Sequence, residues 1–270
     1  MTAPRDLKSQ LAAEARPLGV LVRLPAEQLL ELAGSVDLDF AVIDCEHGPA
    51  DHVALHHHIA VAEAVGLTVL VRVGAADDPD VLRALDLGAA GVIVPHVRDA
   101  REAARAVAAA HYPPLGERGF AGYTRAGRYG ARDAAEHLAL AARRTLVVVM
   151  IEDAAGVEAA EEILAVEGVD AVLVGPADLA VSLGTPGPEG AETVAEATRR
   201  VHAAARRHGR AVLTITGSPA GAERAFADGA DFVVYNTTLL LRSALTAAAA
   251  IRRDHRADRT DTSADKGTAE

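Results

Sequence analysis

Cysteine is almost absent from this chain of 270 residues, whose single thiol belongs to Cys45. One cysteine excludes a disulfide within the chain and is typical of a protein of the reducing cytosol. No stretch approaches the 18 uninterrupted apolar residues that a membrane span requires. The first residues, MTAPRDLKSQ, carry charges where a signal peptide needs an apolar stretch. We therefore expect a soluble, cytoplasmic protein without a membrane partner.

Lysine is nearly as scarce, because Lys8 and Lys266 are the only two among 27 basic residues. The first precedes every predicted strand and the second lies in the C-terminal segment, so neither is expected at the end of a core strand. Carbonyl chemistry through a Schiff base needs a lysine in the site. If the protein makes or breaks carbon–carbon bonds of a 2-oxo acid, we expect a metal ion to be the electron sink.

The balance of charge is acidic, with a formal net charge of −11. Such a charge disfavours nucleic acid and anionic membrane surfaces as partners. The glycine fingerprint of dinucleotide-binding folds, G-x-G-x-x-G after an early strand, is also absent, so we expect no nucleotide cofactor. Half of the residues are hydrophobic, which is enough to bury a large core in one domain.

Short apolar runs recur along the chain at roughly 25-residue spacing, separated by Ala-rich amphipathic segments. Eight of these runs read as strands: 19–23, 40–44, 68–72, 91–95, 146–151, 171–174, 211–215 and 232–235. This alternation predicts an α/β protein, a (β/α)8 TIM barrel over residues 1–251, with an open doubly wound sheet as the alternative. The charged residues 252–270 are predicted to form a disordered tail.

Two acids stand at the ends of successive predicted strands. Glu152 directly follows the apolar run 146–151, and Asp178 comes four residues after the run 171–174. Because parallel strands end at the same edge of the barrel, we expect both carboxylates to face one site. Paired carboxylates beside a Gly-rich turn suit a hard divalent cation such as Mg²⁺ or Mn²⁺. Pairing with arginines, which would only stabilise loops, is an equal alternative.

Arg72 and His47 also stand at predicted strand ends. The planar fork of Arg72 suits a substrate carboxylate, and its alternative is a structural ion pair with Glu152 or Asp178. His47 is available as a general base near pH 7, or is a loop histidine without a role. Asp86, at the end of a predicted helix, has the pattern of a surface acid. Further candidates at the strand ends are Arg23, Asp44, Glu46, His96, Thr216 and Asn236.

Several motifs together resemble the metal-dependent class II pyruvate aldolases, a family that includes 4-hydroxy-2-oxoheptanedioate and 2-dehydro-3-deoxyglucarate aldolases. The resemblance spans about residues 18–250. Its motifs are VIDCEHGP (42–49), VRV (71–73), LDLGAAGVIVPHV (85–97), YPPLGERG (112–119), the IE of VMIE (149–152) and EGVDAVLVGPADLAVSLG (167–184). Taken together, in this order and spacing, the motifs are specific.

The resemblance implies roles for individual residues. Glu152 and Asp178 would hold Mg²⁺, Mn²⁺ or Co²⁺, and Arg72 would bind the pyruvate carboxylate. Gly175, Pro176, Ala177 and Asp178 would form the substrate-binding turn. His47 would be the base, with Asp86 raising its basicity. The implied reaction is the reversible cleavage of a 4-hydroxy-2-oxo acid into pyruvate and a small aldehyde through a pyruvate enolate, in a homo-oligomer, a trimer or hexamer.

Some positions depart from the family pattern. Met150 stands where the best-known members have Gln, Arg23 lies near the mouth, and Asn236 replaces a common Asp. These changes surround the site without removing the expected metal, base or carboxylate ligands, so the acceptor aldehyde is left open. Two other interpretations also stay open: a related barrel lyase acting on an acyl-CoA ester, and a non-catalytic oligomeric binding barrel.

Overall fold

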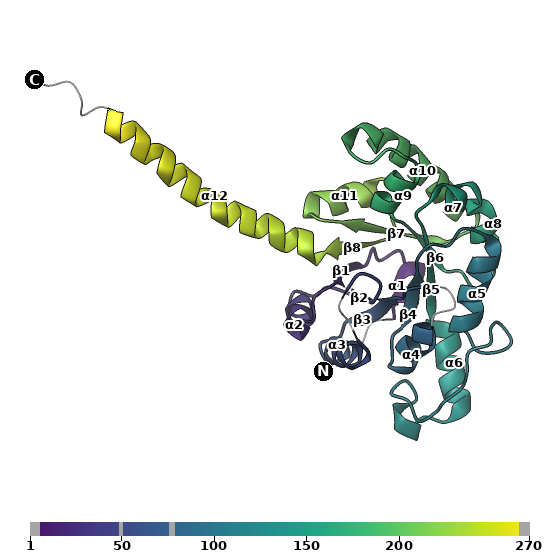
Figure 1. The fold of residues 1–270 in the computed structure, drawn as a ribbon. Coiled ribbons are helices and arrows are strands. Elements are labelled where there is room, and N and C mark those ends of the chain that lie inside the picture. Colours follow the sequence, from purple (N-terminus) through teal and green to yellow (C-terminus); the bar gives the residue numbers. More distant parts are fainter. Residues whose placement is uncertain (1–5, 49–50, 76–78, 265–270) are drawn as a thin grey trace, which may run out of the picture.

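Eight parallel strands close into a barrel in the order of the sequence, and the last strand pairs with the first (Figure 1). The computed structural model describes residues 6–48, 51–75 and 79–264, with side chains as far as residue 251. The strands are β1 (Leu18–Val22), β2 (Phe40–Asp44), β3 (Thr68–Arg72), β4 (Gly91–Val94), β5 (Leu146–Ile151), β6 (Ala171–Val174), β7 (Ala211–Thr216) and β8 (Phe232–Asn236). The predicted (β/α)8 barrel is confirmed, and its closure excludes the open sheet.

Helices cover the outside of the barrel and follow the strands in turn (Figure 1). They are α1 (Leu7–Ala12), α2 (Glu27–Ser35), α3 (His52–Ala64), α4 (Pro79–Asp86), α5 (Ala100–Ala110), α6 (Ala134–Arg144), α7 (Ala154–Glu158), α8 (Ala160–Ala165), α9 (Pro176–Ser182), α10 (Ala191–Arg207), α11 (Pro219–Ala227) and α12 (Thr237–Ala264), with short 3-10 helices η1 (Arg128–Gly130) and η2 (Pro188–Gly190). None of the helices described is long and apolar enough to cross a membrane.

The last helix, α12, is longer than its sequence pattern indicates. The sequence predicted an end near Ile251, where charged residues begin, but the helix continues to Ala264 and projects away from the barrel (Figure 1). The proposed domain boundary at residue 251 stays a prediction. Pro49 of the EHGP motif, Lys266 and residues 265–270 of the predicted tail lie outside the described residues.

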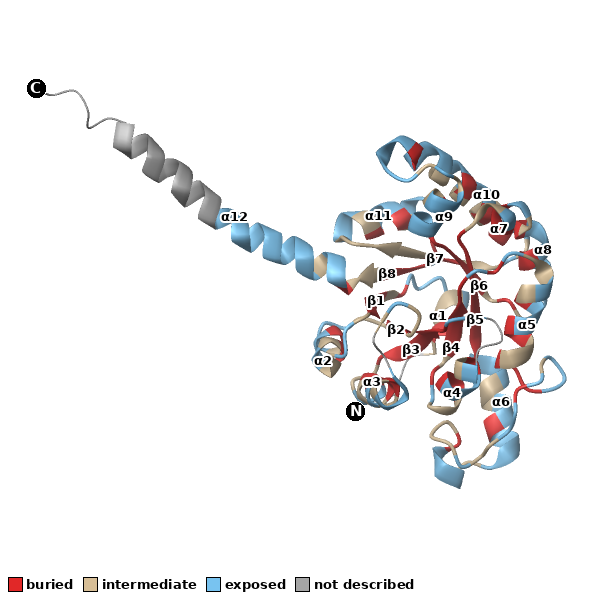
Figure 2. Cartoon of the chain, in the orientation of Figure 1, coloured by how far each residue is buried: buried red, intermediate tan, exposed pale blue. Residues whose placement is uncertain are grey.

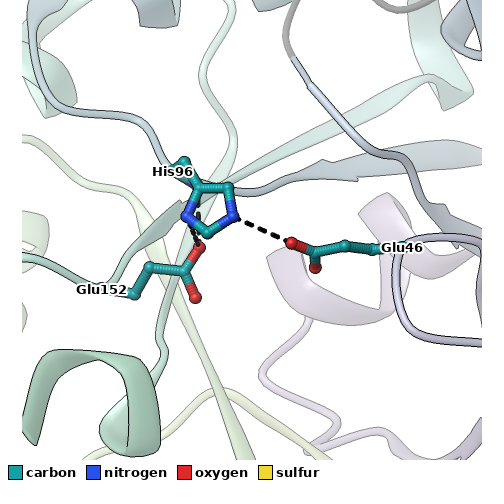
Figure 3. A group of neighbouring side chains, drawn as sticks. All are labelled: Glu46, His96 and Glu152. Carbon is teal, nitrogen blue, oxygen red and sulfur yellow. Dashed lines mark hydrogen bonds and ion pairs between the residues drawn. The ribbon is translucent and has the colours of Figure 1, made fainter. Parts of the chain in front are cut away.

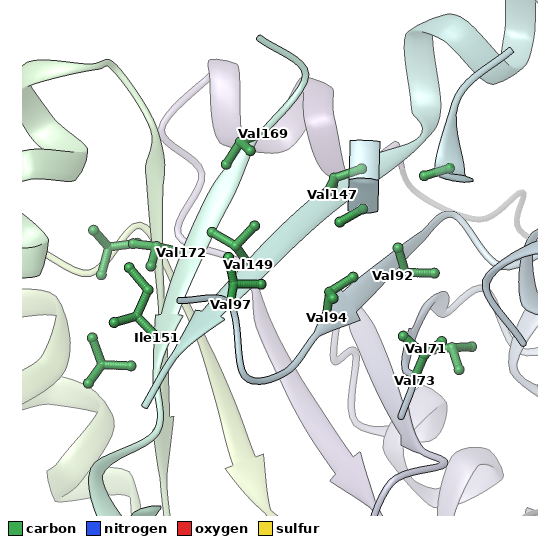
Figure 4. Close-up of a cluster of buried hydrophobic side chains, with 14 of the residues drawn as sticks. Val71, Val73, Val92, Val94, Val97, Val147, Val149, Ile151, Val169 and Val172 are labelled. Atoms are coloured by element: carbon green, nitrogen blue, oxygen red, sulfur yellow. The ribbon is translucent and has the colours of Figure 1, made fainter. Parts of the chain in front are cut away.

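The strands β5 and β6 are apolar throughout because both of their faces are buried (Figure 2). Along β5, Leu146, Val148 and Met150 point into the barrel, whereas the alternate residues pack outward against the helices. Figure 4 shows this outer layer, in which Val147 and Val149 lie among the valines of neighbouring strands. Each fully buried aliphatic side chain of this kind contributes about 1.5–3 kcal/mol. Strand ends are therefore the first positions at which polar side chains become useful.

Aspartates begin several of the helices that follow the strands. Asp51, Asp99, Asp133 and Asp153 each accept a hydrogen bond from the backbone N–H three residues later. Such caps satisfy amides that have no partner inside the helix. Because Asp153 caps α7 two residues after the end of β5, Glu152 lies between the strand and the helix.

Candidate active site

A cavity of about 470 Å³ opens at the carboxyl ends of the strands, where barrel enzymes carry their active sites. Its apolar wall includes Ile93, Leu173 and Val234, which point inward from their strands. Its polar lining consists of Arg23, His47, Arg72, Asp178, Thr216 and Asn236, beside the backbone of residues 175–177. The cavity thus brings together most of the side chains that the sequence predicted for the site.

Arg72 is held in this cavity by a buried carboxylate, Asp44. Arg72 Nε donates to Asp44 Oδ1 at 2.9 Å and Nη2 to Oδ2 at 2.5 Å, and Asp44 is fully buried. Burial alone would raise the pKa of Asp44, but the hydrogen bonds and charge of Arg72, with hydrogen bonds from Arg23 and the His47 backbone, hold that pKa below its usual value. Burial would likewise lower the pKa of Arg72, and Asp44 raises it above the usual value. The guanidinium is therefore charged and fixed in orientation.

The third nitrogen of Arg72, Nη1, lies on the side away from this pair. It is 3.2 Å from Glu46 Oε2 and 3.8 Å from the sulfur of Met150. Arg23 Nε also donates to Asp44 Oδ2, at 2.6 Å, so two arginines share one carboxylate. Arg72 thus forms a structural ion pair, but with Asp44 and Glu46 and not with Glu152 or Asp178, the acids considered from the sequence.

Glu152 lies in a second cluster of charged side chains, with His96 and Glu46 (Figure 3). His96 Nδ1 is 2.9 Å from Glu152 Oε1, and its Nε2 is 3.0 Å from Glu46 Oε1. The backbone N–H of His96 also donates to Glu152 Oε1 at 2.8 Å. His96 adopts φ of 56°, a left-handed conformation that is uncommon for a residue other than glycine. This backbone conformation lets one residue contact Glu152 through both its ring and its amide.

Glu152 also contacts the turn that carries Asp178. A Cβ on Gly175 would lie 2.5 Å from Glu152 Oε2, so glycine is required for the turn after β6 to approach this closely. Burial raises the pKa of Glu152 above its usual value, and the negative charges of Glu46 and Asp178 add to this effect while His96 opposes it. Because the carboxylates of Glu46 and Asp178 repel that of Glu152, binding of a proton or of a cation among them is favoured.

The donor atoms fit a divalent cation. One ligand atom each from Glu46, His96 and Glu152 lie within 4.8 Å of one another. Asp178, the second ligand predicted from the sequence, is not a member of this group, but its charge acts on Glu152 from the first turn of α9. Carboxylate oxygens are the ligands that Mg²⁺ and Mn²⁺ prefer, and imidazole adds a nitrogen donor. The sequence placed Glu46 and His96 at strand ends but gave them no role; their signal was their position just after β2 and β4.

The structure separates His47 from Asp86. His47 is exposed at the carboxyl end of the barrel, three residues after β2, and its Nε2 is 4.0 Å from Glu46 Oε1. Asp86 ends α4 and therefore lies at the amino-terminal end of the barrel, where Arg118 Nη2 donates to its Oδ1 at 2.7 Å. Within one chain, Asp86 therefore cannot act on His47.

The raised pKa of Glu152 predicts how the stability of the metal-free protein depends on pH. A carboxyl whose pKa is higher in the folded state stabilises the fold below its unfolded pKa of about 4.3, and this contribution is lost as pH rises through the folded pKa. Glu152→Gln keeps an oxygen that accepts the hydrogen bond of the His96 amide. Because glutamine does not ionise, the variant does not lose this stability as pH rises. We expect the variant to be the more stable protein at pH 7 in EDTA, and the difference to disappear toward pH 4, in urea titrations. If the wild-type protein is instead more stable than Glu152→Gln at pH 7 in EDTA, the pKa of Glu152 is not raised in the folded state.

Fold and site together define a (β/α)8-barrel enzyme with acids and a fixed arginine at its mouth. Residues 18–239 match the family described as HpcH/HpaI aldolase/citrate lyase, and the chain belongs to this family. It is 34% identical to a protein of Klebsiella pneumoniae named 5-keto-4-deoxy-D-glucarate aldolase, over 89% of this chain and 94% of that one. The predicted resemblance and the predicted enzyme class, an aldolase-type lyase, are confirmed.

Solved structures support the same assignment. An HpcH/HpaI aldolase from Desulfitobacterium hafniense superposes with a TM-score of 0.84 at 31% identity, over 91% of this chain and 96% of that chain. The citrate lyase beta subunit of Mycobacterium tuberculosis is only 19% identical, over 86% of this chain and 94% of that one, with a TM-score of 0.53. This second likeness shows the fold alone and gives no support to an acyl-CoA substrate.

Proposed function

We propose that this chain is a divalent-metal-dependent aldolase that cleaves a 4-hydroxy-2-oxo acid of the keto-deoxy-glucarate class into pyruvate and a small aldehyde. The observation that carries the proposal is the buried Glu152 packed against the turn 175–178, beside a cavity that contains the fixed guanidinium of Arg72. The aldolase from Klebsiella pneumoniae is named for such a substrate. We also propose that the protein is a cytoplasmic homo-oligomer, a trimer or hexamer.

Glu152 and Asp178 would hold the divalent ion, which when bound supplies a Lewis acid for the 2-oxo group. Arg72 would bind the substrate carboxylate, because its guanidinium is charged, oriented by Asp44 and part of the cavity lining. The guanidinium of Arg72 would also stabilise the negative charge that develops on the oxo oxygen of the substrate. Since Asp44 fixes the side chain in advance, little reorganisation is needed when substrate binds.

His47 would remove the proton from the 4-hydroxyl group. It lines the cavity and its ring is more than half exposed, so a substrate can reach it directly or through one water molecule. Asp86 can support this histidine only from another subunit, because the two lie at opposite ends of the same barrel.

This cross-subunit role predicts that two inactive variants restore each other. Mixed oligomers of His47→Ala and Asp86→Asn chains contain sites with an intact His47 from one chain and an intact Asp86 from the other. We expect the mixture, refolded together, to exceed the activity of either variant by at least about tenfold. If the activity of the mixture does not exceed the average activity of the two variants, Asp86 does not act on His47.

Arg23 is proposed to favour an acidic aldehyde. It lines the cavity, keeps about a third of its side chain exposed and shares Asp44 with Arg72. Removing the positive charge of Arg23 should reduce kcat/KM for a carboxylate-bearing aldehyde by about tenfold, with little change for a neutral aldehyde of the same length. Aldol addition with pyruvate measures both rates for Arg23→Ala. An equal effect on the two aldehydes would exclude this role.

The experiment that tests the proposed function is a substrate panel in the cleavage direction. Pyruvate released from 4-hydroxy-2-oxo acids of different length and charge is measured with added Mg²⁺ or Mn²⁺, and again in EDTA. We expect metal-dependent pyruvate release, fastest for the sugar-acid substrates. Release that continues unchanged in EDTA would contradict the proposal.

A further inference from the structure

His96 adopts a backbone conformation that is unfavourable for a residue with a side chain. Its φ of 56° lies in the left-handed region, where the Cβ of a residue other than glycine is crowded. The segment after β4 is tied down at the next residue, because Val97 donates its backbone N–H to the Met150 carbonyl at 3.1 Å. Backbone strain of this kind persists where the surrounding structure enforces it, and it is concentrated at functional sites. The conformation therefore points to a role for His96.

This conformation brings two nitrogen atoms of His96 to one oxygen atom of Glu152 (Figure 3). Ring Nδ1 lies 2.9 Å from Glu152 Oε1, and the backbone N–H donates to the same oxygen at 2.8 Å. No other described residue forms a hydrogen bond or an ion pair with the side chain of Glu152. The second oxygen, Oε2, faces the turn after β6, where a Cβ on Gly175 would lie 2.5 Å from it. His96 thus holds one oxygen of this buried carboxylate and leaves the other toward the turn that carries Asp178.

The opposite edge of the His96 ring contacts Glu46. Ring Nε2 lies 3.0 Å from Glu46 Oε1, and Glu46 Oε2 lies 3.2 Å from Arg72 Nη1. Only 9% of the Glu46 side chain is exposed, so water is largely excluded as an alternative partner. Side-chain contacts through Glu46 and His96 therefore connect Arg72, the proposed ligand of the substrate carboxylate, with Glu152, the proposed ligand of the metal ion.

We propose that His96 is a positioning residue for the metal ligand Glu152. The inference rests on the proposed function, in which Glu152 and Asp178 hold the divalent ion. Hydrogen-bond partners of a metal-binding side chain orient it, and loss of such a partner typically weakens metal binding by about 10–100-fold. Without the ring, Glu152 keeps only the amide of residue 96 as a partner among the described residues, and its carboxylate can rotate away from the turn. In this assignment the ring acts through Glu152 and does not itself bind the ion.

Calorimetric titration of the full chain with Mg²⁺ and with Co²⁺ tests the proposal in the variant His96→Gly. Glycine adopts the left-handed conformation without strain and keeps the backbone N–H, so the substitution removes only the ring. We expect the affinities for Mg²⁺ and Co²⁺ to fall by the same factor, about 10–100-fold. Free imidazole can reach the vacated position, because half of the His96 side chain is exposed. It should restore part of the lost Mg²⁺ affinity and leave the wild-type affinity unchanged.

His96→Asn is a second variant, which separates the two contacts of the ring. Asparagine also tolerates the left-handed backbone, and its side-chain amide takes the place of ring Nδ1 but does not extend to that of Nε2. The variant therefore keeps a donor for Glu152, loses the contact with Glu46, and should bind Mg²⁺ within about threefold of the wild type. His57→Ala is the matched control, because it removes an exposed histidine that also lies near an acid, 3.9 Å from Glu27, outside the candidate active site.

Unchanged Mg²⁺ affinity in His96→Gly overturns the proposal, and so does a loss that imidazole does not restore. A loss confined to Co²⁺ makes the ring itself a ligand and also overturns it, because nitrogen ligands favour Co²⁺ over Mg²⁺. Urea unfolding verifies that each variant is folded. If the wild-type protein binds neither ion, the proposed function is contradicted and this role of His96 with it.

Discussion

Asp178→Asn and Glu152→Gln should each lower kcat/KM for cleavage by at least about a thousandfold, since a bound metal contributes several kcal/mol of charge stabilisation. Glu152 is 3% exposed and lies against the turn that carries Asp178, so each substitution removes one of the two carboxylates proposed to hold the ion. Both variants should also lose Mn²⁺ binding in calorimetry. The metal measurement separates a lost ligand from a merely slower enzyme.

Asp153→Asn is the matched control for these two substitutions. Asp153 is the next residue after Glu152, but it accepts the N-cap hydrogen bond of α7 from Gly156 and pairs with Arg98. Asparagine caps a helix nearly as well, so the fold and Mn²⁺ affinity should stay close to those of the wild type. Wild-type Mn²⁺ affinity in Asp178→Asn or Glu152→Gln would contradict the assignment of the metal ligands.

Arg72→Leu should have two effects of different origin. It removes the proposed ligand of the substrate carboxylate, so kcat/KM should fall by about a hundredfold or more. It also leaves Asp44 with its main partner gone at a fully buried position, which should lower the free energy of unfolding by about 3–5 kcal/mol. Enzyme kinetics and urea unfolding measure the two effects.

A double variant separates stability from activity at this position. Asp44→Leu/Arg72→Leu replaces the buried pair by apolar side chains, which should recover much of the lost stability without recovering activity. Arg23→Leu, which removes the more exposed partner of the same carboxylate, should lower stability by only about 1 kcal/mol or less. If the double variant regains activity together with stability, Arg72 has a structural role only.

The barrel could be predicted because its signal is local and repeated. Runs such as 146–151 are apolar at every position, as strands buried on both faces must be, and the acids after β5 and β6 fall where such burial ends. Parallel strands then place those acids at one edge without further information. The family motifs added the roles of Arg72 and His47, which the pattern alone left open.

The cluster of Glu46, His96 and Glu152 could not be predicted in this way. Its members follow β2, β4 and β5, and their contact depends on the left-handed backbone of His96 and on side-chain directions across the barrel mouth. Residue spacing reveals neither the backbone conformation of His96 nor these side-chain directions. The pairing of Arg72 with Asp44 rather than with a site acid likewise depends on the register of β2 and β3, in which these two residues are neighbours.

Asp86 and α12 show two further limits of sequence reasoning. The resemblance linked Asp86 to His47 without placing either in space, whereas α4 follows β3, packs against β4 and ends at the far side of the barrel. In α12, the sequence pattern indicated a helix end near Ile251, yet the helix continues to Ala264. Arginine and alanine are both good helix formers, so charge alone did not mark an end.

Proton exchange at the methyl group of pyruvate in D₂O is the most direct test of a metal-dependent site built on Glu152 and Asp178. The wild-type protein with Mn²⁺ or Mg²⁺ should replace these protons with deuterium, without any aldehyde present, and EDTA should stop the exchange. Asp178→Asn should show none under the same conditions. If the exchange persists in EDTA, or if Asp178→Asn exchanges these protons at the wild-type rate, a metal-dependent site built on Glu152 and Asp178 is contradicted.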